Sequence, residues 1–191
     1  TELDGKLSQT VGDARYAPIG AAGVNPNDVG YDVWAILSQS NGGSGNGIDL
    51  TMIDTTDPRI DQFANTSSVT YNRQIVRAVD PLFHQTALSG VGFPMTFAKN
   101  YLGSVPPNRR VLLVPCGRGS TSFVPANGYT WDPADTTTTN NLYNLAVSQI
   151  AAALVAAGPS ARLAGVLWHQ GEGDSGDTTA ANAYAAHLDA V

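Results

Sequence analysis

Cysteine, basic clusters and long apolar runs are scarce in this sequence, and each scarcity excludes a class of protein. The 191 residues contain one cysteine, Cys116, which excludes an internal disulfide framework and a zinc site built from cysteines. The formal net charge is −6, and only Arg109 and Arg110 stand together as a basic pair, so we expect no nucleic-acid partner. No apolar run approaches the ~20 residues of a membrane span, so we expect no such span. Residues 1–4 lack the basic, apolar start of a signal peptide.

Residues 1–30 form a polar leader that differs from the rest of the chain, because proline and glycine interrupt any regular element there. The run VGDARYAP, residues 11–18, resembles a short linker that recurs in phage tail-fibre and minor tail proteins. That resemblance implies location in a virion, or otherwise outside the cell, with other phage tail proteins as partners and with homo-oligomerisation. An ordinary flexible leader is the alternative.

Three short apolar runs predict buried strands, and three longer segments predict helices. The predicted strands are Val33–Leu37, Val111–Pro115 and Leu163–Trp168, with Gln74–Val79 as a further candidate, and the predicted helices are Pro94–Leu102, Asn140–Ala157 and a segment from Thr178 to the chain end, capped by Asp177. Residues 43–68 and 117–139 are polar and predict long loops.

Buried strands that alternate with helices predict a three-layer α/β/α domain around a parallel sheet. The loops that follow the three strands then converge on one edge of the sheet, where such folds keep their active sites. Ser40, residues 117–120 and residues 169–174 lie in those loops. The convergence predicts one site rather than three unrelated turns.

Ser40 is the candidate nucleophile, because it follows the strand Val33–Leu37 directly. Three interpretations compete for its segment, Ser-Gln-Ser-Asn-Gly. It can be a plain turn, since most of these residue types favour turns. It can be the nucleophile elbow G-x-S-x-G, although Ser38 stands where the first glycine belongs. A phosphate-binding loop is set aside, because the Lys-Ser/Thr ending and the glycine spacing are missing.

Residues 31–191 resemble the SGNH hydrolase superfamily, and within it the carbohydrate acetylesterases of the sialate O-acetylesterase-like group, carbohydrate esterase family 6. Five motifs carry the resemblance in order: Ser38-Gln39-Ser40-Asn41, Asp80-Pro81-Leu82, Gly92 to Ala98, Val114 to Thr121, and Trp168-His169-Gln170-Gly171-Glu172-Gly173-Asp174. The first departs from the group's G-Q-S-N at Ser38, and the third has one extra residue between Gly92 and Pro94. The resemblance implies an SGNH, flavodoxin-like sheet and removal of acetyl groups from an acetylated carbohydrate, with neither metal nor cofactor.

The resemblance also assigns roles to individual residues. It implies that Ser40 attacks the ester and that the N–H groups of Ser40 and Gly92, with the Gln170 amide, form the oxyanion hole. It implies that Glu172 holds the catalytic histidine. We expect the substrate-binding residues to be Gln39, Asn41, Trp131 and Asp174. Trp131, like its neighbours in residues 117–139, can instead shield the core.

The expected base is missing from the sequence. The group places a histidine in a C-terminal D-x-x-H motif, and no such motif occurs in these 191 residues. We expect His84 to pack or hydrogen-bond at the surface, His169 to support its loop, and His187 to lie on a solvated helix face. The chain is then either an N-terminal portion of a longer esterase, which we favour, or a degenerate one.

Other functions stay open on sequence alone. The domain can be a tail adhesin or structural module that keeps the fold without chemistry, or a lipase or thioesterase of the same superfamily. The carboxylates Glu172, Asp174 and Asp177 can form a glycosidase pair, although loop carboxylates usually cap helices or face water. Cys116 adjoins a buried strand and is expected to be a small core residue.

Overall fold

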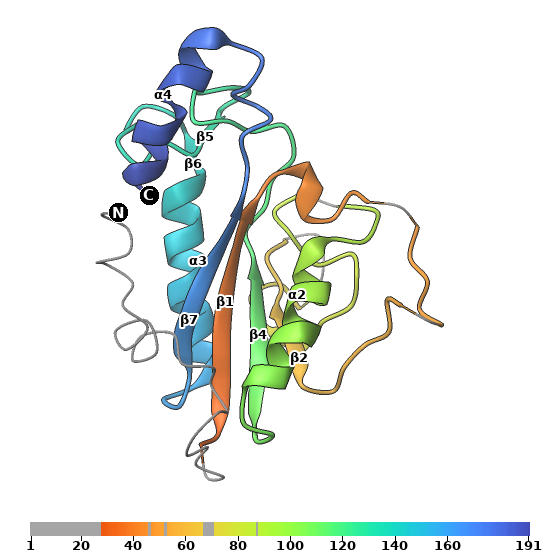
Figure 1. Ribbon diagram of the computed structural model, residues 1–191. Helices are drawn as coiled ribbons and strands as arrows, with labels where there is room; N and C mark the ends of the chain where they lie inside the picture. The colour runs from red at the N-terminus through yellow and green to blue at the C-terminus, as the bar shows by residue number, and fades with distance from the viewer. Residues whose placement is uncertain (1–27, 46, 52, 67–70, 87) are drawn as a thin grey trace, which may run out of the picture.

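The computed structural model describes residues 28–45, 47–51, 53–66, 71–86 and 88–191. A five-stranded sheet runs through it in the order β3-β2-β4-β1-β7 (Figure 1). Its strands are β1 (Gly30–Ser38), β2 (Ile60–Phe63), β3 (Ile75–Arg77), β4 (Arg109–Pro115) and β7 (Arg162–His169). All neighbours pair in parallel except β2 and β3. The predicted α/β fold class is therefore confirmed, with one antiparallel edge strand as a correction to the all-parallel prediction.

Helices cover both faces of this sheet, α2 (Phe93–Tyr101) on one side and α3 (Leu142–Ala157) on the other (Figure 1). Residues of β1 pack against the helices on both faces of the sheet, since successive strand residues point to opposite faces. Val33 and Leu37 pack in the cluster that includes α3, and Ile36 packs in the cluster that includes α2. Burial on both faces explains why these strands read as uninterrupted apolar runs.

The helices begin and end within two residues of their predicted bounds. Pro94 stands in the first turn of α2, where its missing N–H costs nothing. The Asn141 side chain caps α3 by accepting from the Asn144 N–H. Asp177 caps α4 (Thr178–Asp189) in the same way. Short turns η1 (Ser40–Gly42) and η2 (Leu102–Ser104) and a two-stranded ribbon, β5 (Tyr129–Thr130) with β6 (Asn140–Asn141), complete the described elements.

The prediction of a continuous loop over residues 43–68 is wrong, because β2 lies within it. The strand has only four residues, and its two middle ones, Asp61 and Gln62, are polar. Both are buried and both have partners: Asp61 pairs with Arg77 and Arg110, and Gln62 accepts from the Phe83 N–H at 2.8 Å. A strand that buries paired polar groups leaves no apolar run for sequence analysis to detect.

A buried ion network closes the amino-terminal edge of the sheet, opposite the carboxyl ends of the strands. The Asp32 side chain is fully buried on β1 and accepts from Arg109 at 2.8 Å, from Arg162 at 2.6 Å and from the Tyr101 hydroxyl at 2.9 Å. Burial and Asp32 together raise the pKa of Tyr101 to about 12. The network ties β1, β4, β7 and α2 together at one point.

The predicted tail-linker segment, residues 11–18, falls outside the described residues. None of the described helices has the length and hydropathy of a membrane-spanning segment.

The ion network predicts a large stability difference between two aspartates that both bind Arg109. Asp32→Asn should lower the free energy of unfolding by about 3–5 kcal/mol, because it leaves buried cations without their partner. Asp28→Asn should cost less than about 1 kcal/mol, since Asp28 is one-third exposed. Urea unfolding of both variants measures this, and equal losses would contradict the account.

Candidate active site

The candidate site lies at the carboxyl end of β1, between β4 and β7. The chain leaves β1 toward β2 and β4 on one side and later reaches β7 on the other, so this is the switch point at which open α/β sheets bind ligands. The Arg118 N–H donates to the Ser38 carbonyl at 3.0 Å, and the Gln39 N–H donates to the His169 carbonyl at 3.3 Å. The three strand-end loops therefore meet, as the sequence predicts.

Ser40 opens the turn η1 directly after this junction. The Gly42 N–H donates to the Gln39 carbonyl, and the Gly43 N–H donates to the Ser40 carbonyl, at 3.0 and 3.1 Å. Ser40 is half-buried, and the nearest neighbour of Gly119 is the Ser40 side chain, at 3.9 Å from the position that a Cβ would take. Ser40 thus stands on a tight turn, and the residue beside its side chain is Gly119, which has no side chain of its own.

Gly92 lies against this turn, as its predicted role requires, but its N–H has another partner. A Cβ at Gly92 would collide with the Gly42 carbonyl, so only glycine fits. The Gly92 N–H faces the carboxyl of Asp80 and lowers its pKa, although Asp80 Oδ1 has no hydrogen-bond partner of normal geometry. Burial outweighs the effect of this N–H and raises that pKa to about 6. The oxyanion role of Gly92 requires its N–H to turn from Asp80, and it stays a prediction.

The Gln170 amide holds the loops together in this structure. Its nitrogen donates to the Thr121 carbonyl and to Asp174, both at 2.9 Å, and lies 3.4 Å from Gln39 Oε1. Gln39 Oε1 also accepts from the Gly173 N–H at 3.3 Å. Both side chains are buried and join the loops to one another, although Gln170 Oε1 has no hydrogen-bond partner. The predicted contact of Gln39 with substrate and of Gln170 with an oxyanion would need these bonds to be exchanged.

Asp174 is a structural carboxylate rather than a surface one. It is 2% exposed, and it accepts from the backbone N–H groups of Phe123 and Val124 as well as from Gln170. The prediction that Asp174 contacts substrate is therefore corrected: it joins the loop after β7 to the loop after β4.

Asn41 and Glu172 are the predicted site residues that the structure leaves exposed together. The Asn41 amide donates to the Glu172 carboxylate, a contact that joins the Ser40 turn to the loop after β7. Both side chains are accessible to solvent. The Glu172 carboxylate is thus held by the residue that follows Ser40 in sequence. Because it is exposed, it can accept a hydrogen bond from a further group.

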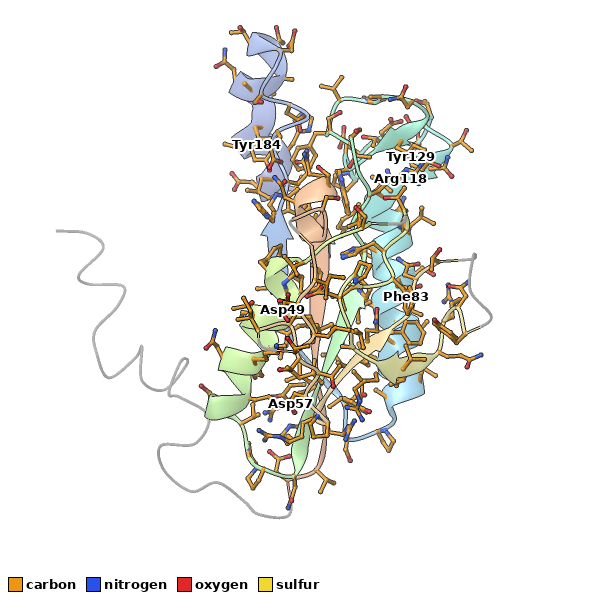
Figure 2. The ribbon with its side chains drawn as sticks, turned by 90° about the vertical axis from the view of Figure 1, so that its right-hand side faces the viewer. Asp49, Asp57, Phe83, Arg118, Tyr129 and Tyr184 are labelled. Atoms are coloured by element: carbon orange, nitrogen blue, oxygen red, sulfur yellow. The ribbon has the colours of Figure 1, made fainter. Side chains whose placement is uncertain are left out.

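The predicted substrate contact of Trp131 is also wrong. Its side chain is fully buried, and its indole N–H donates to Thr121 Oγ1 at 3.0 Å. It shields the core beneath the loop after β4, which was the alternative. The ring nearer the surface is Tyr129, over which the Arg118 guanidinium stacks at 3.6 Å (Figure 2).

The three histidines contact Gly117, Phe93 and Phe123. His84 is 1% exposed, and its Nδ1 accepts the Gly117 N–H at 2.9 Å, so the predicted surface position is wrong. Burial lowers its pKa to about 4. His169 is exposed and packs its ring edge-on against Phe93. His187 is half-buried and stacks on Phe123, which corrects its expected solvated state. Each of the three has contacts with groups other than Ser40 in the described part of the chain.

Cys116 is fully buried, as predicted, and burial raises the pKa of its thiol to about 12. It is therefore a core residue and no nucleophile. Among the described residues, no three His, Cys, Asp or Glu side chains are grouped so that they could hold a metal ion. Ser40, Asn41 and Glu172 are the predicted site residues whose side chains remain accessible at this edge of the sheet.

Comparison with known proteins adds four findings. A family of carbohydrate esterases described as sialic acid-specific acetylesterases matches residues 30–191. The chain is 34% identical over 99 residues to the probable 9-O-acetyl-N-acetylneuraminic acid deacetylase of Escherichia coli K12, and the aligned region covers 48% of this chain and 30% of that protein. The structure of the chain described here resembles the crystal structure of NanS, with a TM-score of 0.66 and 25% identity, and the match covers 85% of this chain and 61% of that one.

A protein from Arabidopsis thaliana shares the fold at 23% identity, with a TM-score of 0.62 over 83% of this chain and 66% of that one. The chain therefore spans less than two thirds of NanS and less than a third of its curated E. coli relative.

The buried hydrogen bonds of Asp174 predict that Asp174→Asn lowers the stability of the fold, whereas Asp177→Asn leaves it nearly unchanged. Asp174→Asn should lower the free energy of unfolding by about 3 kcal/mol, because an amide nitrogen would face buried N–H donors. Asp177→Asn should change it by less than about 0.5 kcal/mol, since asparagine caps helices as well as aspartate does. Thermal or urea unfolding compares the two, and a harmless Asp174→Asn would show that the carboxylate is not needed there.

The lowered pKa of His84 predicts a pH dependence of stability. An unfolded histidine takes up a proton near pH 6.5, whereas folded His84 stays neutral to about pH 4. The unfolded state therefore binds more protons between these values, and stability falls as the pH drops through them. The free energy of unfolding of the wild type, relative to that of His84→Asn, should fall by about 3 kcal/mol from pH 7 to pH 4. A difference that stays constant over this range would show that His84 titrates normally.

Proposed function

The chain belongs to the sialic acid-specific acetylesterase family of carbohydrate esterases, and we propose that it forms the nucleophile-bearing part of an enzyme that removes acetyl groups from a carbohydrate. The observation that carries the proposal is the position of Ser40. It stands on a tight turn at the switch point of the sheet, next to a solvent-exposed pair of Asn41 and Glu172.

In the proposed reaction, Ser40 Oγ attacks the acetyl carbonyl, and its proton passes to a base. The tetrahedral intermediate then expels the sugar hydroxyl, which takes that proton. Water attacks the resulting acetyl-enzyme, and acetate leaves with the Ser40 hydroxyl restored. The Ser40 N–H suits the developing oxyanion, because the first N–H groups of a helical turn lack partners within the turn.

The base is proposed to be a histidine in a D-x-x-H segment C-terminal to these 191 residues. The three histidines present contact other groups, whereas the Glu172 carboxylate is exposed and able to orient an imidazole. The matched part of NanS is 61% of that chain, which leaves room for such a segment in a related protein.

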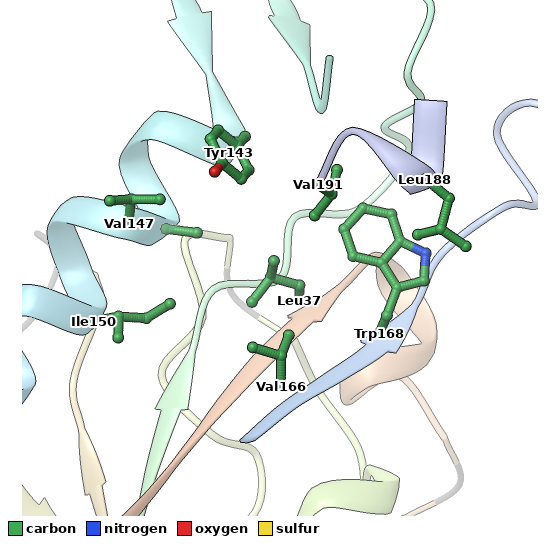
Figure 3. Close-up of a pocket in the computed structure, with 9 residues that line it drawn as sticks. Leu37, Tyr143, Val147, Ile150, Val166, Trp168, Leu188 and Val191 are labelled. Carbon is green, nitrogen blue, oxygen red and sulfur yellow. The ribbon is translucent and has the colours of Figure 1, made fainter. Parts of the chain in front are cut away.

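The outer edge of β7 supports this proposal. Leu163 and Val166 are each about half exposed on this strand, although they belong to an apolar run typical of a buried one. Val166 also lines an apolar pocket of about 350 Å³ between β7, α3 and the end of α4 (Figure 3). Its lining includes Leu37, Val166, Trp168 and Leu188. We propose that the segment with the base packs along this edge.

The substrate is proposed to be an O-acetylated sugar, with O-acetylated sialic acid as the first candidate. The similarity to the probable 9-O-acetyl-N-acetylneuraminic acid deacetylase of E. coli supports that choice. Association with a phage tail, proposed from residues 11–18 alone, stays a prediction. A non-catalytic glycan-binding module is the competing function, since the base is not among these residues.

Release of acetate from O-acetylated sialic acid tests the proposal. The chain translated to its natural stop codon should release acetate, and Ser40→Ala should lower the rate at least ~10³-fold. Ser44→Ala is the matched control on an exposed position of the same loop and should leave the rate unchanged. Glycan binding without turnover, equal in wild type and Ser40→Ala, would favour the binding module instead.

A further inference from the structure

His84 lies in a segment that contacts both loops of the candidate site. The Gln85 N–H donates to the Gly117 carbonyl at 3.2 Å, and Thr86 Oγ1 accepts from the Gly119 N–H at 3.2 Å. Further along, the Gly90 N–H donates to the Gly43 carbonyl at 3.0 Å. Residues 84–86 thus lie beside the loop after β4, and Gly90 lies beside the Ser40 turn.

This segment is itself anchored to β2. The Phe83 N–H donates to Gln62 Oε1 at 2.8 Å, and the Phe83 carbonyl accepts from the Asn65 N–H at 2.9 Å. The residue before His84 is therefore held by the sheet, so the imidazole enters the space between the loops from a fixed backbone.

The imidazole fills the space where the two loops come closest. A Cβ at Gly117 would collide with Ser38 Oγ and lie 2.7 Å from His84 Nδ1. A Cβ at Gly42 would collide with the same hydroxyl and lie 3.3 Å from His84 Cε1. Gly42, Gly117, Ser38 and His84 therefore form one close-packed buried group directly beneath the Ser40 turn.

The hydrogen bond to Gly117 fixes the protonation state of this imidazole. Because Nδ1 accepts the Gly117 N–H, a neutral His84 must carry its proton on Nε2. Nε2 is buried without a hydrogen-bond partner of normal geometry, although the Gly42 carbonyl is near enough to raise the pKa against the larger effect of burial. A protonated Nδ1 would instead confront the Gly117 N–H donor to donor.

We propose that His84 is a positioning residue for Ser40: its neutral imidazole holds Gly117 against Ser38 and Gly42, and so fixes the Ser40 turn relative to the loop after β4. The inference rests on the proposed role of Ser40 as nucleophile. His84 takes no proton from Ser40 and acts only through the backbone of these loops.

Two substitutions separate positioning from space-filling, measured on acetate release by the full chain. His84→Asn places Oδ1 near the position of Nδ1, so it can still accept from Gly117 N–H. His84→Phe keeps the ring but offers no acceptor. We expect His84→Phe to lower kcat about 10²-fold with KM little changed, since a small displacement of a reacting group costs about that much. His84→Asn should stay within about 10-fold of the wild type, and His187→Gln, on α4, should leave kcat unaltered.

A nitrogen-15 spectrum of the wild type provides a readout that does not depend on catalysis. We expect a coupling across the hydrogen bond between the Gly117 amide nitrogen and His84 Nδ1, and an imidazole in the Nε2–H form at pH 7. Protonation on Nδ1, or no coupling, would overturn the inference even if neither variant folds.

The outcomes distinguish this inference from the proposed function. If the wild type is active and the kcat of His84→Phe equals or exceeds that of His84→Asn, the ring only fills space. In that case the inference fails and the proposed function stands. If the wild type shows no activity that depends on Ser40, the proposed function fails and the positioning role fails with it.

Discussion

The loops after β1 and β4 and the start of α2 approach one another so closely that only glycine fits at their contacts, and the candidate site depends on this close approach. A side chain at Gly42 or Gly117 would collide with Ser38, and one at Gly92 would collide with the Gly42 carbonyl. Parallel strands bring their carboxyl ends to one edge of the sheet, but only glycine allows the loops beyond them to meet. The turn that presents Ser40 follows from that close approach.

Close approach also buries polar groups, and the fold satisfies most of them with long-range partners. Asp174 accepts from the backbone more than fifty residues away in sequence, at Phe123, and His84 accepts from Gly117. At the other end of the sheet, Asp32 accepts hydrogen bonds from two arginines that are also distant in sequence, Arg109 and Arg162. Because a buried donor or acceptor without a partner is costly, these side chains determine where the loops lie. Asn41 and Glu172 are left exposed, so under the proposed function they can meet a substrate or an imidazole.

The sequence predicted the parts of the fold whose signal is local. The apolar runs of β1, β4 and β7 were evident because both faces of these strands are buried, and they placed Ser40 and Glu172 at one edge. β2 was missed because Asp61 and Gln62 are buried through partners distant in sequence. The surface position of His84 and the substrate contacts of Trp131 and Asp174 were wrong for the same reason: burial of a polar or aromatic loop residue depends on tertiary contacts that no local pattern records.

The central claim is that Ser40 is the nucleophile, and covalent trapping tests it most directly. The full chain would be treated with a serine-reactive phosphonate ester, digested and examined by mass spectrometry. The account predicts one adduct, on Ser40, whose formation O-acetylated sialic acid slows by competition. An adduct on another serine, or an enzyme that releases acetate without ever labelling Ser40, would contradict it.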